Sequence, residues 1–236
     1  MMAILVILIV ILNSLYYNYS PHRAQRKELM SYMERKYGET FEFVSIMTPL
    51  ASYRRYGAYH MEVKSKNLPD KIIDVHMNVN IESSYRDNYI MFLMHDEFRE
   101  MLQEIAKSVY GTPVQVVIPP VKGSGTMPEE VTIGISVEEY ARALSLNRNH
   151  PSVEIYTAGD TKTHEEDAER LRQRFEEIGF SPRLTISYVS NTENIGNLSH
   201  NSNFMSVSSG FLKLRGSLVM DSNYQFESID WEEATD

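Results

Sequence analysis

Two stretches of alternating residues decide the fold, Tyr59-His60-Met61-Glu62-Val63-Lys64 and Ile73-Asp74-Val75-His76-Met77-Asn78-Val79. Apolar residues occupy every second position in both stretches, which is the period of a half-buried β-strand. The segment between them, Asn-Leu-Pro-Asp at 67–70, has the chemistry of a turn, so the two strands are predicted to form a hairpin. One face of this hairpin is apolar and is expected to face a core, while the other face is polar.

The polar face of the hairpin carries two histidines and two carboxylates. If the turn centres on Leu68, the two histidines lie opposite each other, and so do the two carboxylates. Cross-strand neighbours have Cβ atoms roughly 5 Å apart, and imidazole and carboxylate groups are ligands of zinc. The candidate metal ligands are therefore His60, Glu62, Asp74 and His76. The alternative is a solvated sheet face with ordinary polar residues, which needs no ligand.

Helical and strand patterns flank the hairpin on both sides. The predicted elements are a helix over 25–37, a strand over 40–46, a helix over 88–110 and a strand over 113–118. The Pro119-Pro120 pair and the Gly- and Ser-rich stretch after it indicate a linker over 119–130.

The same mixture of patterns returns beyond the linker. Ser136 with Glu139 and Thr163 with Glu166 have the spacing of capping boxes at two helix starts. The predicted elements are helices over 137–146 and 163–178 and strands over 152–157, 183–189, 204–207, 211–220 and 224–229. We therefore predict an α+β fold, with helices packed on one face of mainly antiparallel sheets. Its two small units are expected at 24–118 and 131–230.

The N-terminus is apolar and points to a membrane. Residues 1–12 contain no polar side chain, and Leu15, Tyr16 and Tyr17 extend the run. As a helix, this segment spans roughly 25 Å, against about 30 Å for the hydrocarbon core of a bilayer. We predict an uncleaved transmembrane helix over 1–20. The alternatives are a buried core helix and a cleaved signal peptide, although the basic n-region and a clear cleavage site are missing.

Charge bears on both orientation and partners. Arg23, Arg26 and Lys27 follow the apolar run, and the positive-inside rule taken literally places the rest of the chain in the cytoplasm. Residues 28–236 hold the other 20 basic residues and all 32 acidic ones, a formal charge of −12. No stripe of basic and aromatic residues appears, so nucleic acid is not expected as a partner. The absence of cysteine excludes disulfides, thiolate metal sites and thiol catalysis, and no cofactor is expected.

A resemblance covers the first half of the chain, to about residue 118. Residues 32–45, Tyr-Met-Glu-Arg-Lys-Tyr-Gly-Glu-Thr-Phe-Glu-Phe-Val-Ser, precede the hairpin, and Arg86-Asp87-Asn88-Tyr89 follows it. This pattern resembles small membrane-anchored proteins of unknown function from Gram-positive bacteria. Those proteins have an N-terminal anchor, a helix ending in Lys-Tyr-Gly, an alternating strand and an Asp-x-Tyr segment before the next helix. The resemblance implies an anchored, outward-facing protein and supplies no catalytic residues; the basic residues that usually precede the apolar run are absent here.

Together these observations predict a membrane-anchored, extracytoplasmic binding or interaction module without catalysis. Its expected partners are the membrane, through the N-terminal helix, and an envelope protein. The alternative function is a divalent-metal-binding protein or metal-dependent hydrolase that uses the polar face of the 59–79 hairpin.

Overall fold

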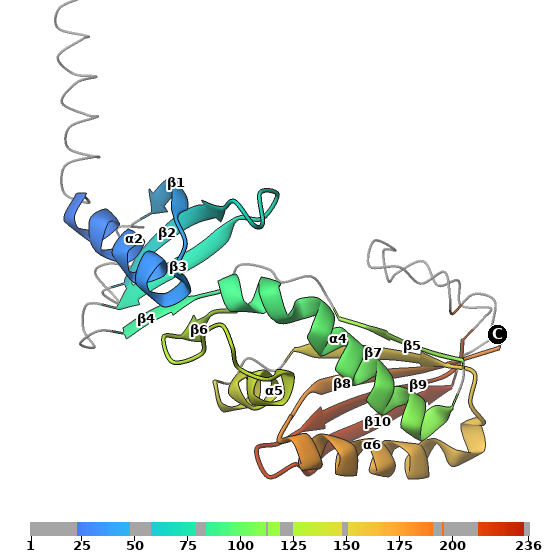
Figure 1. Cartoon of the computed structure of the whole chain (residues 1–236). Helices are drawn as coiled ribbons and strands as arrows, with labels where there is room; N and C mark the ends of the chain where they lie inside the picture. Colours follow the sequence, from blue (N-terminus) through green and yellow to red (C-terminus); the bar gives the residue numbers. More distant parts are fainter. Residues whose placement is uncertain are drawn as a thin grey trace, which may run out of the picture. The chain divides into compact units, whose positions relative to one another are not determined.

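The chain has an α+β fold made of two compact units, each with its own five-stranded sheet (Figure 1). The computed structural model describes residues 23–47, 58–78, 84–111, 113–118, 125–147, 151–190, 195 and 212–233. The first unit comprises residues 1–89 and 128–133, and the second comprises residues 90–127 and 134–236. The predicted fold class is therefore confirmed.

The first unit packs helix α2 (Arg23–Tyr37) on a sheet of strand order β1-β2-β3-β4-β6. Its strands are β1 (Phe41–Met47), β2 (Ala58–Ser65), β3 (Ile73–Asn78), β4 (Ser84–Asp87) and β6 (Met127–Pro128). Strands β1 to β4 are antiparallel neighbours. The four-residue strand β4 had no sequence signal of its own.

The hairpin β2–β3 has the predicted register, with His60 opposite His76 and Glu62 opposite Asp74. The side chains of its apolar face are all at most 6% exposed: Tyr59, Met61, Val63, Ile73, Val75 and Met77. Strict alternation was thus sufficient to fix which face enters the core, because a one-residue slip would expose the whole apolar set.

A buried ion pair joins helix α2 to the end of β4. Lys36 Nζ lies 2.8 Å from Asp87 Oδ2, and the two side chains are 2% and 0% exposed. The Tyr32 and Tyr37 hydroxyls each donate to the same carboxylate at 2.6 Å, and the Tyr89 amide donates to it at 2.9 Å. Burial lowers the pKa of the Lys36 ammonium, and the neighbouring Asp87 opposes that shift. The Lys-Tyr-Gly and Asp-x-Tyr segments singled out in the sequence therefore meet in one polar cluster.

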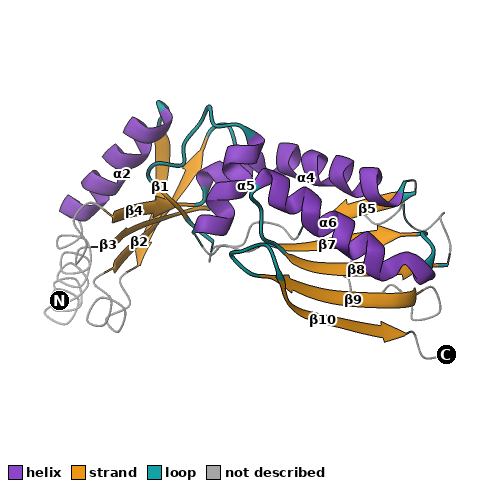
Figure 2. Ribbon diagram, turned by 90° about the horizontal axis from the view of Figure 1, so that it is seen from below, coloured by secondary structure: helices purple, strands orange, loops and turns teal. Residues whose placement is uncertain are grey.

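The second unit lays helices α4 and α6 on one face of a sheet of order β10-β9-β8-β7-β5 (Figure 2). Its helices are α4 (Tyr89–Tyr110), which starts at the unit boundary, α5 (Val137–Leu146) and α6 (His164–Ile178). Its strands are β5 (Val114–Val117), β7 (Ser152–Thr157), β8 (Arg183–Val189), β9 (Leu212–Met220) and β10 (Phe226–Glu233). Strands β7 and β8 are parallel and connected through α6, and the other pairs are antiparallel.

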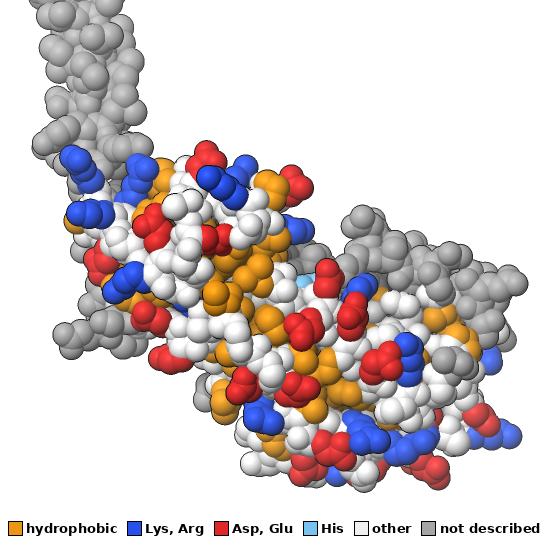
Figure 3. All heavy atoms as spheres, viewed as in Figure 1, with side chains coloured by type: hydrophobic (Ala, Val, Ile, Leu, Met, Phe, Trp, Pro, Cys, Tyr) orange, Lys and Arg blue, Asp and Glu red, His pale blue; other side chains and the backbone are white. Residues whose placement is uncertain are grey.

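Charged side chains of both signs are interspersed over α6 (Figure 3). Arg172 pairs with Glu169 at 2.8 Å and with Glu176 at 2.9 Å, and Arg174 pairs with Glu177 at 2.9 Å. These pairs at i, i+3 and i, i+4 are typical of a solvated helix face.

The division between the units differs from the predicted linker at 119–130. Helix α4 and strand β5 belong to the second unit, because β5 pairs with β7 and Gln103 of α4 bonds the backbone of Val114 and Val116 at 2.8 Å each. Residues 128–133 instead belong to the first unit, where the Thr132 hydroxyl donates to the Lys36 carbonyl at 3.0 Å. Short-range patterns do not report such long-range pairing.

One of the two predicted capping boxes is confirmed. The Glu139 amide donates to the Ser136 hydroxyl at 3.2 Å, and the Ser136 amide donates to the Glu139 carboxylate at 2.9 Å. The second box is wrong: a short 3₁₀ turn (Thr161–Thr163) precedes α6, and Thr163 makes no side-chain cap. Its hydroxyl is instead within hydrogen-bond distance of the Asp160 carbonyl and the Asp167 carboxylate.

No helix within the described ranges is long and apolar enough to cross a membrane. The predicted anchor at 1–20 and the predicted strand over 204–207 lie outside those ranges.

Candidate functional site

The second unit contains a cavity of about 510 Å³ where α5, the start of β8 and the β9–β10 turn meet. This volume falls in the range of small-molecule sites, which is about 300–1,000 Å³. Three separate segments line the cavity: Arg142, Ser145 and Leu146; Gly179, Ser181 and Arg183; and Val219, Met220, Asp221, Ser222, Tyr224 and Glu227.

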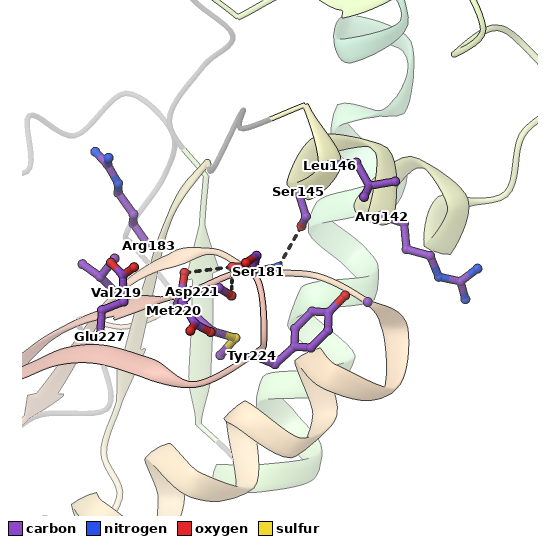
Figure 4. A pocket seen from close by; sticks show the side chains of 12 residues that line it. Arg142, Ser145, Leu146, Ser181, Arg183, Val219, Met220, Asp221, Tyr224 and Glu227 are labelled. Carbon is purple, nitrogen blue, oxygen red and sulfur yellow. Dashed lines mark hydrogen bonds between the residues drawn. The ribbon is translucent and has the colours of Figure 1, made fainter.

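Two serines tie the walls of the cavity together. The Ser181 amide donates to the Ser145 hydroxyl at 2.8 Å, which joins β8 to α5. The Ser181 hydroxyl lies 2.8 Å from the Met220 carbonyl and 2.9 Å from the Asp221 carbonyl, which joins it to the β9–β10 turn (Figure 4). Ser181 itself is 1% exposed. These bonds fix the shape of the cavity, because they anchor three of its walls to one buried residue.

The turn between β9 and β10 presents Tyr224 to the cavity. The Asp221 carboxylate accepts hydrogen bonds from the amides of Asn223 at 2.8 Å and Gln225 at 2.7 Å, which closes the turn. Tyr224 has a φ of 58°, the one positive φ of a non-glycine residue in the described ranges. The Arg172 guanidinium donates to its carbonyl at 3.1 Å. An aromatic residue held in the left-handed region is costly, and such outliers cluster at functional sites.

Charged side chains of both signs line the cavity. Arg142 and Arg183 lie on opposite sides of Ser181, and the Tyr224 ring lies between them (Figure 4). Neither guanidinium has an ion-pair partner in the described part of the chain, although Arg142 Nε donates to the Ile178 carbonyl at 3.3 Å. Glu227 likewise makes no ion pair there, while the Asp221 carboxylate is used by the turn. Two cationic groups and one open carboxylate therefore remain for a ligand.

Sequence reasoning missed this cavity. Its residues come from segments as far apart as 142 and 227, and none of them forms a motif. The one local signal was Gly179, which ends α6 in the left-handed conformation with a φ of 71°. A Cβ at Gly179 would collide with the Arg142 side chain, so the lack of a side chain here leaves room for the aliphatic part of Arg142 at the cavity wall.

The polar face of the hairpin brings together three of the four predicted metal ligands. His60 Nε2 lies 2.7 Å from Asp74 Oδ1, and the His60 and His76 rings are stacked with centroids 4.5 Å apart and planes at 7°. Asp74 also accepts from the Asn88 amide group at 3.0 Å. Glu62 is not part of this cluster; its carboxylate accepts from the Ser45 hydroxyl at 2.7 Å.

The geometry of this cluster is that of a stacked pair. The described residues contain no group of three or more His, Cys, Asp or Glu arranged to hold a metal ion. Nitrogen lone pairs lie in the ring planes, so nearly parallel stacked rings direct them side by side, whereas zinc needs both nitrogens to converge at about 2.0–2.1 Å. Metal binding by His60, Glu62, Asp74 and His76 stays a prediction, and it requires at least one ring to rotate.

His76 is expected to make the first unit sensitive to acid. Burial, with the nearby His60 and Arg86, lowers the pKa of His76 from 6.5 to about 4, against the effect of Asp74. Its buried Nε2 has no hydrogen-bond partner within the described ranges. The folded state then binds fewer protons than the unfolded state between these two values, so stability is lost as the pH falls through that range. The shift corresponds to at most about 3 kcal/mol. Unfolding of the first unit by denaturant, monitored by hydrogen exchange at a series of pH values from 7.5 to 4.5, measures this loss of stability.

The control is His76→Asn, which cannot gain a proton and should flatten the pH dependence. An unchanged slope in this variant would contradict the assignment to His76. Zinc at pH 7.5 provides a separate comparison, because a metal bound only to the folded state raises stability. Stabilisation by stoichiometric zinc that is lost in His76→Ala would support the metal site, and its absence would exclude it.

Comparisons with known proteins add little to this picture. No family model matches the chain, and no curated protein matches it. Among solved structures, the chain is similar to the crystal structure of a DUF5037 family protein from Ruminococcus gnavus ATCC 29149. The two share 20% identity over 85% of this chain and 93% of that chain, with a TM-score of 0.40. A likeness this distant carries no argument about fold or function.

Proposed function

We propose that this protein is a membrane-tethered, non-catalytic binding module that takes a short peptide or another small zwitterion in the cavity of its second unit. The observation that supports this proposal most directly is that the cavity lining offers charged groups of both signs, Arg142 and Arg183 on one hand and Glu227 on the other. A ligand with one anionic and one cationic end matches this lining better than a plain anion does.

Each end of such a ligand has a partner. A carboxylate suits Arg142 or Arg183, because a guanidinium presents a planar fork of donors to two oxygens. An ammonium suits Glu227, and the apolar body of the ligand suits Leu146 and the Tyr224 ring. Leu146 is 83% exposed, which leaves a large apolar side chain uncovered at the rim.

The proposed membrane anchor is argued from the sequence alone. The apolar run at 1–20 supports a membrane anchor, and the resemblance to anchored Gram-positive proteins supports an outward-facing second unit. The basic residues after the run favour the opposite orientation. Reporter fusions at the C-terminus, one active only outside the membrane and one only inside, test the orientation; a signal only from the inside reporter would overturn the extracytoplasmic placement.

The ligand is tested with alanyl-leucyl-alanine and its N-acetylated, C-amidated form. Calorimetry on the full chain in detergent should detect binding of the free peptide and at least about tenfold weaker binding of the blocked one, because charge-assisted hydrogen bonds contribute about 1.5–3 kcal/mol. Arg183→Ala should weaken binding of the free peptide by a similar factor.

The matched control is Arg174→Ala, which removes an arginine paired with Glu177 on α6 and outside the cavity lining. It should leave affinity unchanged. Equal binding of free and blocked peptides, or equal loss in both variants, would contradict a zwitterion site. No binding of either peptide would remove the support for a peptide ligand.

A further inference from the structure

Strand β10 is a long open edge of the second sheet. Seven of its eight residues pair with β9, from Phe226 opposite Met220 to Glu233 opposite Leu214, and the register shifts between Phe226 and Ser228. On its other side no described strand follows, and Figure 2 shows it as the outermost strand. An edge of this length presents a row of backbone N–H and C=O groups that can pair with a further strand.

The side of β10 that faces the helices carries two large apolar residues and is only partly covered. Ile229 lies opposite Leu218, and Trp231 lies opposite Gly216, so both point to the helix side. Trp231 packs over Gly216, where no Cβ would fit, and its ring centroid is 4.5 Å from that of His164. Ile229 nevertheless remains 51% exposed, and the buried Trp231 Nε1 has no hydrogen-bond partner among the described residues.

The negative charge of β10 favours a basic partner strand. Its sequence, Phe-Glu-Ser-Ile-Asp-Trp-Glu-Glu, has four acidic residues and no basic one. A second copy of β10 paired alongside it would set carboxylates against carboxylates, which is destabilising. A strand with lysine or arginine at alternate positions would instead place opposite charges across from Asp230 and Glu232 on the outer face.

We propose that β10 accepts a sixth strand from another protein, an extended segment in which basic residues alternate with apolar ones. Backbone hydrogen bonds would hold the segment, as in other cases of strand addition to a sheet edge. Its apolar side chains would cover Ile229 beside the Trp231 ring, and its basic side chains would meet Asp230 and Glu232. Glu227, near the start of β10, also lines the ligand cavity, whereas Ile229, Asp230, Trp231 and Glu232 lie outside that lining, and strand addition needs no peptide bound in the cavity.

The single tryptophan of the chain, Trp231, reports on this edge directly. The probe is a capped eight-residue peptide that alternates lysine and valine, compared with its counterpart that has glutamate for lysine. The lysine peptide should change Trp231 emission saturably, and the glutamate peptide should not. A lysine peptide with alternate backbone amides N-methylated should bind at least tenfold more weakly to the same protein, because it keeps the charge and loses the strand hydrogen bonds.

The variant Asp230→Lys with Glu232→Lys should weaken binding of the lysine peptide at least tenfold. The matched control, Glu165→Lys with Glu166→Lys, makes the same change of charge in the first turn of α6 and should retain most of the affinity. Equal binding of the N-methylated peptide, or equal loss in both double variants, would reduce the effect to general charge attraction and overturn the proposal. No emission change with the lysine peptide would overturn it too. A dimer in sedimentation velocity, with the β10 amides protected from hydrogen exchange only at concentrations where the dimer forms, would assign the edge to a second copy instead.

Discussion

Replacing Asp87 with alanine is expected to lower the free energy of unfolding of the first unit by about 3–5 kcal/mol, the usual cost of breaking a buried ion pair by removing one partner. The carboxylate is fully buried and accepts hydrogen bonds from Lys36, Tyr32, Tyr37 and the Tyr89 amide. Its loss leaves the ammonium of Lys36 in the core, with the Pro128 carbonyl at 3.0 Å and the Tyr32 hydroxyl at 3.2 Å as its remaining partners. Two tyrosine hydroxyls also lose their acceptor.

The measurement must follow the first unit, because the single tryptophan lies in the second. Hydrogen exchange of α2 and the β2–β3 hairpin in rising denaturant reports on it. The control is Asp70→Ala in the β2–β3 turn, an exposed carboxylate in the same unit, which should change stability by less than about 0.5 kcal/mol. A loss in Asp87→Ala no larger than in Asp70→Ala would show that the ion pair does not hold α2 to the sheet. Lys36→Met combined with Asp87→Ala should cost less than the sum of the single changes, because the buried charge is then gone.

The local parts of the fold could be predicted because each depends on a short period in the sequence. The hairpin shows this best: alternation and one turn set the register that places His60 opposite His76. The β4 strand and the unit boundary could not be predicted in the same way. Strand β4 is four residues long, and the membership of β5 in the second sheet depends on its pairing with β7, forty residues further on.

The same distinction between local and long-range determinants applies to the candidate sites. The cluster of histidines and aspartate could be predicted because cross-strand register determines it. The ring stacking and the hydrogen bond of Glu62 with Ser45 could not, because they depend on side-chain torsions that the local sequence does not encode. The cavity was not predictable, since a loop-borne Tyr224 and a helix-borne Arg142 come together only through the complete unit. Asp167 shows the same limit. Its position in the first turn of α6 gives no local sign of burial, yet it is 3% exposed.

Replacing Asp167 with alanine is therefore expected to destabilise the second unit by about 2–4 kcal/mol. Its carboxylate lies 2.9 Å from the Thr163 hydroxyl, accepts from the Tyr188 hydroxyl at 3.2 Å and pairs with Arg170. Hydrogen bonds to a charged group contribute about 1.5–3 kcal/mol, and an acid in the first turn of a helix adds about 0.3–1 kcal/mol through the macrodipole. Tyr188 is fully buried, so its hydroxyl has no access to water when the acceptor is gone.

Glu166→Ala separates these two contributions, because Glu166 shares the first turn of α6 but is exposed. This variant should lose only the stabilisation that an acid gains from the helix macrodipole. Asp167→Asn keeps an oxygen acceptor for Tyr188 and should recover about half of the loss. Trp231 emission during urea unfolding measures all three variants, since the Trp231 ring centroid lies 6.3 Å from that of Tyr188. Equal losses in Asp167→Ala and Glu166→Ala would mean that the macrodipole alone accounts for the acid, and that the bond between α6 and β8 through Tyr188 contributes nothing measurable to the second unit.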